Sequence, residues 1–437
     1  MNSRLYWISD LCDQVRFLPG PPYKWKIMPE NFTKPELLAP AGNFEKLEVA
    51  IHYGADAVYL AGKDFSLRNL THNFTESEMA DAIHLAHDHG VKVYVACNIY
   101  SRNHEQEKLA RFLETIGEMA PDAVIIADPG IVFLARKLIP QVDIHLSTQS
   151  NTTNYNTLKF WKQAGVTRVN LARELSLKEI QEICTKDILE TETFIHGAMC
   201  ISYSGRCLLS NFLTQRDSNR GACSHPCRWK YRVEEEQRPG QYHPVMEDER
   251  GTYLFNSKDL CMIQFIPELM KAGITSFKIE GRMKGISYLA AVVKTYREAI
   301  DAYAQSPDTF HVADQWKREL GLVYHREYST GFYFNSPDEI VPNYANHHTG
   351  LIHAFIGRAR SCESGNHVTL DVKNKISQGD EVEIMIPRGT PVKSRVKKIT
   401  DPLGMLIEHG QPNSRSTLEL EHGCRPGDII RKTSFPS

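Results

Sequence analysis

The sequence predicts a TIM-type (β/α) barrel that carries a cysteine-bearing insertion and is followed by a small antiparallel β-barrel. Between Glu36 and about Tyr303, eight short and mostly apolar runs alternate with amphipathic helical runs, as expected for parallel strands buried on both faces. From Gly350 onward, polar and apolar residues alternate between turns, which is typical of antiparallel strands. The longest insertion separates the seventh and eighth strands and contains four crowded cysteines.

The strands of the first barrel are short and rich in β-formers. We predict them at Glu36–Pro40, Ala57–Ala61, Lys92–Cys97, Ala123–Ala127, Asp143–Ser147, Arg168–Ala172, Thr193–His196 and Ser276–Ile279. Eight parallel strands with intervening helices favour a closed barrel. The alternative is an open doubly wound sheet, but no GxGxxG phosphate turn follows the first strand.

Composition and pattern divide the chain into four parts. They are a proline-rich, loosely ordered extension (1–33), the barrel as catalytic domain (34–305) with its cysteine-bearing insertion at 198–252, a linker with one helix (306–349), and the small β-barrel (350–437). The small barrel is expected to close because closure removes exposed strand edges. Translation could start at Met1 or at Met28, just before the periodic pattern begins.

The overall composition is that of an ordinary globular protein. The chain has 437 residues, of which 41% are hydrophobic and 24% charged. It contains no run of 18 apolar residues and no secretory signal, so we expect a cytoplasmic protein with no membrane partner. The net charge of −2 does not indicate nucleic-acid binding, which would have to come from a local patch.

Four of the ten cysteines have the spacing Cys200-x6-Cys207-x15-Cys223-x3-Cys227. Cytoplasmic thiols stay reduced, and a reduced group of four indicates a metal site. Structural zinc sites usually combine two tight C-x2–4-C pairs, whereas here only the second pair is short. An iron–sulfur cluster tolerates wider spacing. The spacing alone leaves zinc and an iron–sulfur cluster both open, together with buried inert thiols.

The segment around these cysteines is strongly basic. Between Cys200 and Arg232 there are six Arg or Lys residues and one acid, Asp217, and aromatic residues are interleaved with them. Arginines bind phosphates and aromatic rings stack on bases, so we predict RNA contacts here. The predicted contacts are Arg216, Arg220, Arg228 and Lys230. The alternative is that these cations only balance the thiolates and cover a surface.

A second basic stripe lies in the C-terminal region. Lys393, Arg395 and Lys397 recur at every second position, so a strand would place them on one face. We interpret the stripe as either a solvated face or a second RNA contact.

Polar residues follow several strands of the first barrel and would point into its mouth, where barrel enzymes build their active sites. As catalytic candidates we take His196, Glu174 and Glu280; as binding candidates for a small dicarboxylate we take Arg173, Arg282, Asn98, Gln149 and Asp128. Guanidinium groups suit carboxylates because they form paired hydrogen bonds. Alternatively, Arg173 pairs with Glu174, Arg282 pairs with Glu280, and His196 is a satisfied polar residue.

The segment from Glu192 to Ser210 resembles the signature of the collagenase-like peptidase family of unassigned catalytic type. The resemblance covers about residues 34–435. It includes Glu36–Gly42, Gly54–Tyr59, Ser257–Leu260 and Lys278–Arg282. Within the family, Glu235–Tyr242 and Glu247–Tyr253 most resemble the branch implicated in tRNA hydroxylation.

This resemblance implies a function and a cofactor. Members of that branch are implicated in making 5-hydroxyuridine at the tRNA wobble position, with prephenate required. Sister branches hydroxylate ribosomal RNA or a ubiquinone precursor. Several relatives carry a 4Fe–4S cluster on four cysteines, which correspond to Cys200, Cys207, Cys223 and Cys227. The resemblance therefore favours an iron–sulfur enzyme that hydroxylates tRNA, with prephenate as co-substrate.

Two other functions compete with this one. The family name suggests a protease, but the sequence contains neither an HExxH zinc motif nor a GxSxG nucleophile elbow. The second alternative is an RNA-binding scaffold in which the cluster is structural. The residues do not indicate an oligomeric state.

Overall fold

The computed structural model describes most of the two predicted barrels. The described residues are 34–63, 65–66, 73–200, 202–203, 206–220, 222–228, 246–248, 251–253, 258–334, 354–363 and 365–432. The predicted N-terminal extension and both candidate start residues lie outside them.

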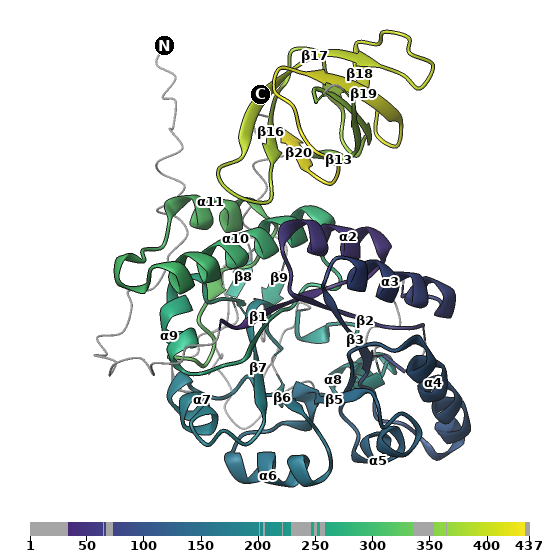
Figure 1. Cartoon of the computed structure of the whole chain (residues 1–437), viewed down its shortest axis with the longest axis vertical. Helices are drawn as coiled ribbons and strands as arrows, with labels where there is room; N and C mark the ends of the chain where they lie inside the picture. Colours follow the sequence, from purple (N-terminus) through teal and green to yellow (C-terminus); the bar gives the residue numbers. More distant parts are fainter. Residues whose placement is uncertain are drawn as a thin grey trace.

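Eight parallel strands close into the predicted (β/α) barrel (Figure 1). They are β1 (Glu36–Pro40), β2 (Ala57–Leu60), β3 (Lys92–Cys97), β4 (Ala123–Ile126), β5 (Asp143–Leu146), β6 (Arg168–Asn170), β7 (Glu190–Ala198) and β11 (Ser276–Ile279). Each strand pairs in parallel with the next, and β11 pairs with both β7 and β1. The closed order confirms the barrel and excludes the open sheet.

Helices surround the strands. They are α2 (Phe44–Tyr53), α3 (Glu76–Asp88), α4 (Gln106–Met119), α5 (Pro129–Leu138), α6 (Tyr155–Gln163), α7 (Leu177–Cys184), α9 (Ile266–Lys271) and α10 (Ile286–Gln305). Several begin at side-chain caps that satisfy free amides, as Thr75 does for α3 and Ser176 for α7. The main hydrophobic core lies between these helices and the outer faces of the strands.

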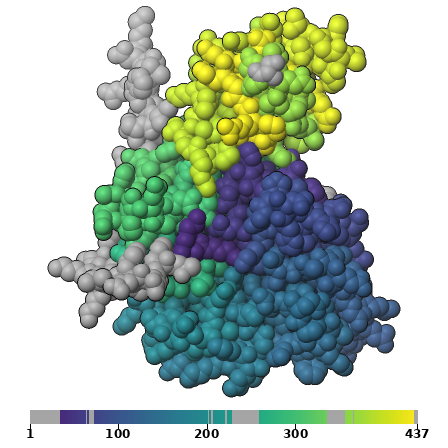
Figure 2. Space-filling view, viewed as in Figure 1, coloured from purple at the N-terminus to yellow at the C-terminus, as the bar shows by residue number. Residues whose placement is uncertain are grey.

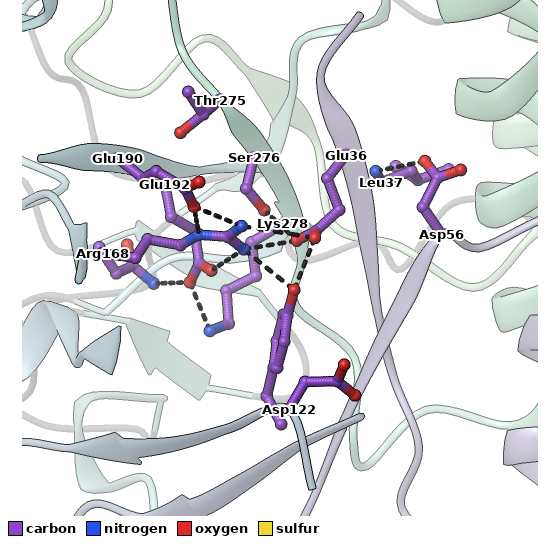
Figure 3. A network of polar contacts seen from close by, with 12 residues as sticks. Glu36, Leu37, Asp56, Asp122, Arg168, Glu190, Glu192, Thr275, Ser276 and Lys278 are labelled. Carbon is purple, nitrogen blue, oxygen red and sulfur yellow. Dashed lines mark hydrogen bonds and ion pairs between the residues drawn. The ribbon is translucent and has the colours of Figure 1, made fainter. Parts of the chain in front are cut away.

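The inside of this barrel has an apolar part and a polar part. Aliphatic and aromatic residues between β1 and β4, such as Leu38, Tyr59 and Ile125, form a separate small core. On β6, β7 and β11 the interior instead holds buried charged residues (Figure 3). Arg168 contacts Glu36 and Glu190, and close beside it Lys278 pairs with Glu192.

The segment between β7 and β11 contains short elements. They are α8 (Leu209–Thr214), the 3-10 turns η4 (Ser218–Arg220) and η5 (Pro226–Arg228), β8 (Met246–Asp248), β9 (Gly251–Tyr253) and β10 (Asp259–Cys261). Strand β10 returns antiparallel to β7 and also pairs with β12 (Tyr328–Ser329). The cysteine-bearing loop therefore leaves the barrel at the carboxyl end of β7.

The C-terminal region forms the predicted antiparallel β-barrel (Figure 1). Its closed order is β13 (Ala354–Glu363), β14 (His367–Asp371), β19 (Arg415–Leu420), β17 (Val392–Thr400), β16 (Glu381–Met385) and β20 (Ile429–Lys432). Two short strands, β15 (Ile376–Ser377) and β18 (His409–Gly410), pair beside it. Aliphatic side chains such as Val368, Ile384 and Leu418 fill its interior.

The second barrel packs against the helices of the first, beside α2 and α11 (Asp314–Leu322), as Figures 1 and 2 show. Arg431 is fully buried and binds Glu319 of α11 and Glu383 of β16 at 2.7 Å each. The Tyr53 hydroxyl donates to the Met385 carbonyl at 2.6 Å and accepts from the Ile429 amide at 3.0 Å. Across the described part of the chain, no helix is both long and apolar enough to cross a membrane.

Candidate functional site

A cavity of about 190 Å³ lies at the carboxyl ends of the barrel strands. Residues from several strands and the loops after them line it, together with the loop that follows β7. Tyr59, Ala96, Ile125 and Phe194 supply apolar surface. This is the end of a TIM-type barrel at which enzymes of this fold place their active sites.

All four clustered cysteines, Cys200, Cys207, Cys223 and Cys227, line this cavity. They come from separate turns of the loop after β7, and the fold brings them to one wall. This is the position predicted for them, at the carboxyl end of the strands. None of the other described cysteines lines the cavity.

Local hydrogen bonds hold the cysteine loop in shape. The Cys207 amide donates to Asn219 Oδ1 at 3.2 Å, and the Cys207 carbonyl accepts from Asn219 Nδ2 at 3.1 Å. The Ser224 amide donates to Ser210 Oγ at 3.0 Å, and the His225 amide donates to Cys223 Sγ at 3.4 Å. These contacts fix the backbone beside two of the four cysteines.

The four cysteines supply the kind and number of ligands that a 4Fe–4S cluster takes, and thiolates also bind zinc. Within the described part of the chain, no three His, Cys, Asp or Glu side chains are grouped so that they could hold one metal ion.

Five of the predicted strand-end residues line the same cavity. They are Asn98, Gln149, Arg173, Glu280 and Arg282. Arg173 lies over the Phe194 ring and donates to the Ala198 carbonyl at 3.3 Å. Arg282 is buried and donates to Ser66 Oγ at 3.0 Å and to Asn73 Oδ1 at 2.6 Å. Both guanidinium groups are therefore held in position at the cavity.

The other three predicted residues, Asp128, Glu174 and His196, do not line the cavity. Asp128 is the N-cap of α5: its Oδ1 accepts from the Gly130 amide at 2.7 Å, and its Oδ2 accepts from the Ser101 amide at 3.2 Å. Its carboxylate is thus engaged in capping a helix rather than in facing the cavity. Glu174 is half-buried beyond the end of β6 and does not line the cavity.

The prediction that His196 points into the mouth of the barrel is wrong. Its ring lies among Tyr288, Tyr296 and Tyr328, with Nδ1 at 3.2 Å from the Tyr296 hydroxyl. The physical reason is an irregularity in the pairing of β7 with β11, which shifts register at Ile279 and so turns His196 outward toward α10. Burial lowers the pKa of His196 to about 3, so the ring is neutral at physiological pH.

Sequence reasoning missed Lys278 and Asn170, which both line the cavity. Lys278 is 5% exposed, and its Nζ donates to Glu192 Oε1 at 2.6 Å. The signal that could have revealed it is parity: Lys278 lies on β11 two residues before Glu280, so the strand's alternation predicts that both side chains point to the same side. The pairing with Glu192 comes from another strand and has no local signal.

The predicted RNA contacts lie on or beside the cysteine loop. Arg216 is exposed and donates from Nε to the Ala222 carbonyl at 3.0 Å. Arg220 and Arg228 belong to η4 and η5, but their side chains and the whole of Lys230 lie outside the described residues. Exposed Tyr203 and Phe212 lie nearby in the same loop. On the second barrel, Lys393, Arg395 and Lys397 are exposed at alternate positions of β17.

Comparisons with known proteins cover nearly the whole chain. Residues 42–343 match the family described as Peptidase family U32, and residues 352–431 match the Peptidase family U32 C-terminal domain. The chain is 39% identical over 401 residues to "tRNA hydroxylation protein P1" of Bacillus subtilis, covering 91% of this chain and 95% of that protein. It is 39% identical over 398 residues to "tRNA hydroxylation protein P" of Escherichia coli, covering 82% and 87%.

A solved structure, that of the U32 peptidase Mk0906, aligns with 60% of this chain and 99% of its own, at 12% identity and a TM-score of 0.39. The extent of the family match, over both barrels, decides the assignment. This chain belongs to peptidase family U32.

Proposed function

We propose that this chain is an iron–sulfur enzyme that modifies RNA by hydroxylating a tRNA wobble uridine to 5-hydroxyuridine. The observation that carries the proposal is the convergence of four cysteines with Arg173 and Arg282 on one cavity at the carboxyl end of the barrel. The relatives named for tRNA hydroxylation, at 39% identity, support tRNA as the substrate.

Cys200, Cys207, Cys223 and Cys227 would hold a 4Fe–4S cluster. With four thiolates as ligands no iron is left open, so a bound cluster would supply electron transfer or structural support. The chain's own residues then bind and orient the reactants. Among the described lining residues, Arg173 and Arg282 face one carboxylate, Glu280, while the charge of Lys278 is paired with Glu192.

This excess of positive charge suits a small anionic co-substrate, and we propose prephenate, a dicarboxylate. Arg173 is positioned by the Phe194 ring, and Arg282 by Ser66 and Asn73. Because these contacts orient the guanidinium groups beforehand, little side-chain entropy is lost when a carboxylate binds. The exposed cations and aromatic rings of the cysteine loop lie beside the cavity, where they can bind the anticodon loop.

The test is mass spectrometry of tRNA nucleosides from a strain that lacks the gene. Loss of 5-hydroxyuridine, its return with the wild-type gene and its continued absence with a Cys223→Ala gene are the expected results. Normal 5-hydroxyuridine in the deletion strain would contradict the proposal and leave an RNA-binding scaffold as the better function. Cleavage of peptides by the purified protein, abolished by replacing one nucleophile, would instead support a protease.

A further inference from the structure

A buried ion pair lies beneath the cavity. Lys278 Nζ is 2.6 Å from Glu192 Oε1, and the two residues are 5% and 2% exposed. Figure 3 shows the pair beside the Arg168 network inside the barrel. A buried ion pair is often no more stabilising than apolar residues of similar size. The pair therefore calls for an explanation other than stability.

The ion pair fixes the orientation of Asn170. Asn170 Nδ2 donates to the same Glu192 Oε1 at 2.8 Å. Glu192 Oε1 also accepts a hydrogen bond from Lys278 Nζ, so it acts as an acceptor, and the amide nitrogen of Asn170 rather than its oxygen must face it. If the amide flipped, two acceptor oxygens would face each other in a buried site. Asn170 Oδ1 is thereby fixed on the side away from Glu192.

Asn170 Oδ1 accepts no hydrogen bond from any residue that the structure describes. Within the described part of the chain, Asn170 Oδ1 has no hydrogen-bond partner, although Asn170 is 3% exposed and lines the cavity. Buried acceptors are normally satisfied, so a molecule in the cavity that donates a hydrogen bond would complete the bonding of this oxygen. Gln149 Oε1, also at this cavity, likewise lacks a partner among the described residues.

The cavity suits a nucleobase. Its volume of about 190 Å³ corresponds to roughly six water molecules at about 30 Å³ each, which leaves space for a pyrimidine ring. The rings of Tyr59 and Phe194 line it and offer stacking surfaces. Enzymes that modify a base flip it out of its stack into such a pocket and read its edge by hydrogen bonds.

We propose that Asn170 Oδ1 accepts a hydrogen bond from the N3–H group of a flipped uracil, and that it thereby selects uracil over cytosine. Cytosine has an unprotonated N3, which would place an acceptor against Asn170 Oδ1. Asn170 is then the specificity-determining residue, and Glu192 and Lys278 are positioning residues that hold its amide. This inference rests on the proposed function, because it assumes that a tRNA uridine is the substrate.

The test measures the binding of full-length protein to labelled tRNA that carries uridine, cytidine or 3-methyluridine at the wobble position. We expect wild-type protein to prefer uridine over both other bases by at least about tenfold. Asn170→Ala should reduce this preference to near onefold. Asn170→Leu, which keeps more of the side-chain volume, should do the same, while Asn366→Ala in the second barrel should leave the preference unchanged.

The outcomes separate this inference from the proposed function. If wild-type protein hydroxylates tRNA but binds all three bases equally, Asn170 does not read the base. The same conclusion follows if the Asn170 variants fold, bind tRNA and keep the full preference for uridine. A rise in the KM for the small anion with unchanged base preference would assign Asn170 Oδ1 to the co-substrate. The 3-methyluridine measurement needs no variant, so it decides the question even if the variants do not fold.

Discussion

The interiors of the two barrels are filled by different kinds of side chain. The second barrel is filled with aliphatic side chains and carries its lysines and arginines outside, as on β17, where Lys393 and Arg395 are exposed. The first barrel buries Arg168, Glu192 and Lys278 inside and keeps a cavity above them. Burying charge is costly unless it is paired, and these charges of the first barrel are paired with one another and with Glu36 and Glu190. The comparison shows that polar groups gather inside the first barrel, next to its cavity.

The cysteines of the chain also lie in two different environments. Cys97 and Cys261 are buried in the main core, where burial raises the pKa of each thiol to about 12. Such thiols stay protonated and are poor metal ligands. The four cysteines of the loop after β7 line the cavity instead and are only partly buried or exposed.

The largest expected effect tests this contrast between cysteines. Protein purified without oxygen should be brown and contain roughly four irons with matching sulfide per chain. Cys200→Ala, Cys207→Ala, Cys223→Ala and Cys227→Ala should each remove most of the iron, whereas Cys97→Ala and Cys261→Ala should retain it. Iron and sulfide assays measure the outcome. Stoichiometric zinc without sulfide in anaerobic protein would refute the cluster.

The next prediction concerns Arg431, a fully buried charge at the junction of the two barrels. Arg431→Ala removes the guanidinium that binds both Glu319 and Glu383. Glu383 then keeps Arg318 at 2.7 Å, whereas buried Glu319 is left with Arg318 only at 3.8 Å. We expect a loss of about 3–5 kcal/mol in the free energy of unfolding, measured by denaturant titration. Arg395→Ala is the matched control, because Arg395 pairs with Glu381 on the surface, and it should change stability by less than about 0.5 kcal/mol. Equal effects would mean that the junction is not stabilised by this arginine.

A third experiment compares the basic surfaces of the two barrels. Each phosphate contact that is lost should lower the salt slope of tRNA binding by about one unit. We expect Arg216→Ala combined with Arg220→Ala to weaken tRNA binding and reduce the slope, with iron content unchanged. Combined replacement of Lys393, Arg395 and Lys397 by alanine should have the smaller effect. The reverse ranking would move the RNA surface to the second barrel.

The smallest expected effect concerns His196. Burial lowers the pKa of His196 to about 3 in the folded protein, whereas an unfolded histidine has a pKa of about 6.5. Below about pH 6.5 the unfolded chain therefore binds a proton that the folded chain excludes, and stability falls as the pH falls toward 3. Between pH 7 and pH 5.5, wild-type protein should lose about 1 kcal/mol more than His196→Phe. Denaturant titrations at both pH values measure the difference, and parallel losses would show that His196 does not titrate in this way.

The pattern of residues by itself determined the architecture. Strands buried on both faces are mostly apolar, so each strand of the first barrel could be located to within a few residues, as β3 and β11 show. From Gly350 onward, alternation likewise predicted antiparallel strands, and β14, β16 and β19 are among those that the structure shows. The cysteine spacing was also local information, because all four residues belong to one loop.

Only the tertiary structure decided which polar residues share the site. The direction of His196 depends on how β7 pairs with β11, and a register shift between two distant strands leaves no mark in either segment. Asp128 caps α5 instead of facing the cavity, because the free amides at the start of this helix donate hydrogen bonds to its carboxylate. Lys278, Glu192 and Asn170 come from three strands and meet only because the barrel closes. The hydrophobic period and the motif spacing of a sequence describe one segment at a time. The orientation of a side chain depends on residues of other segments, which only the folded structure brings next to it.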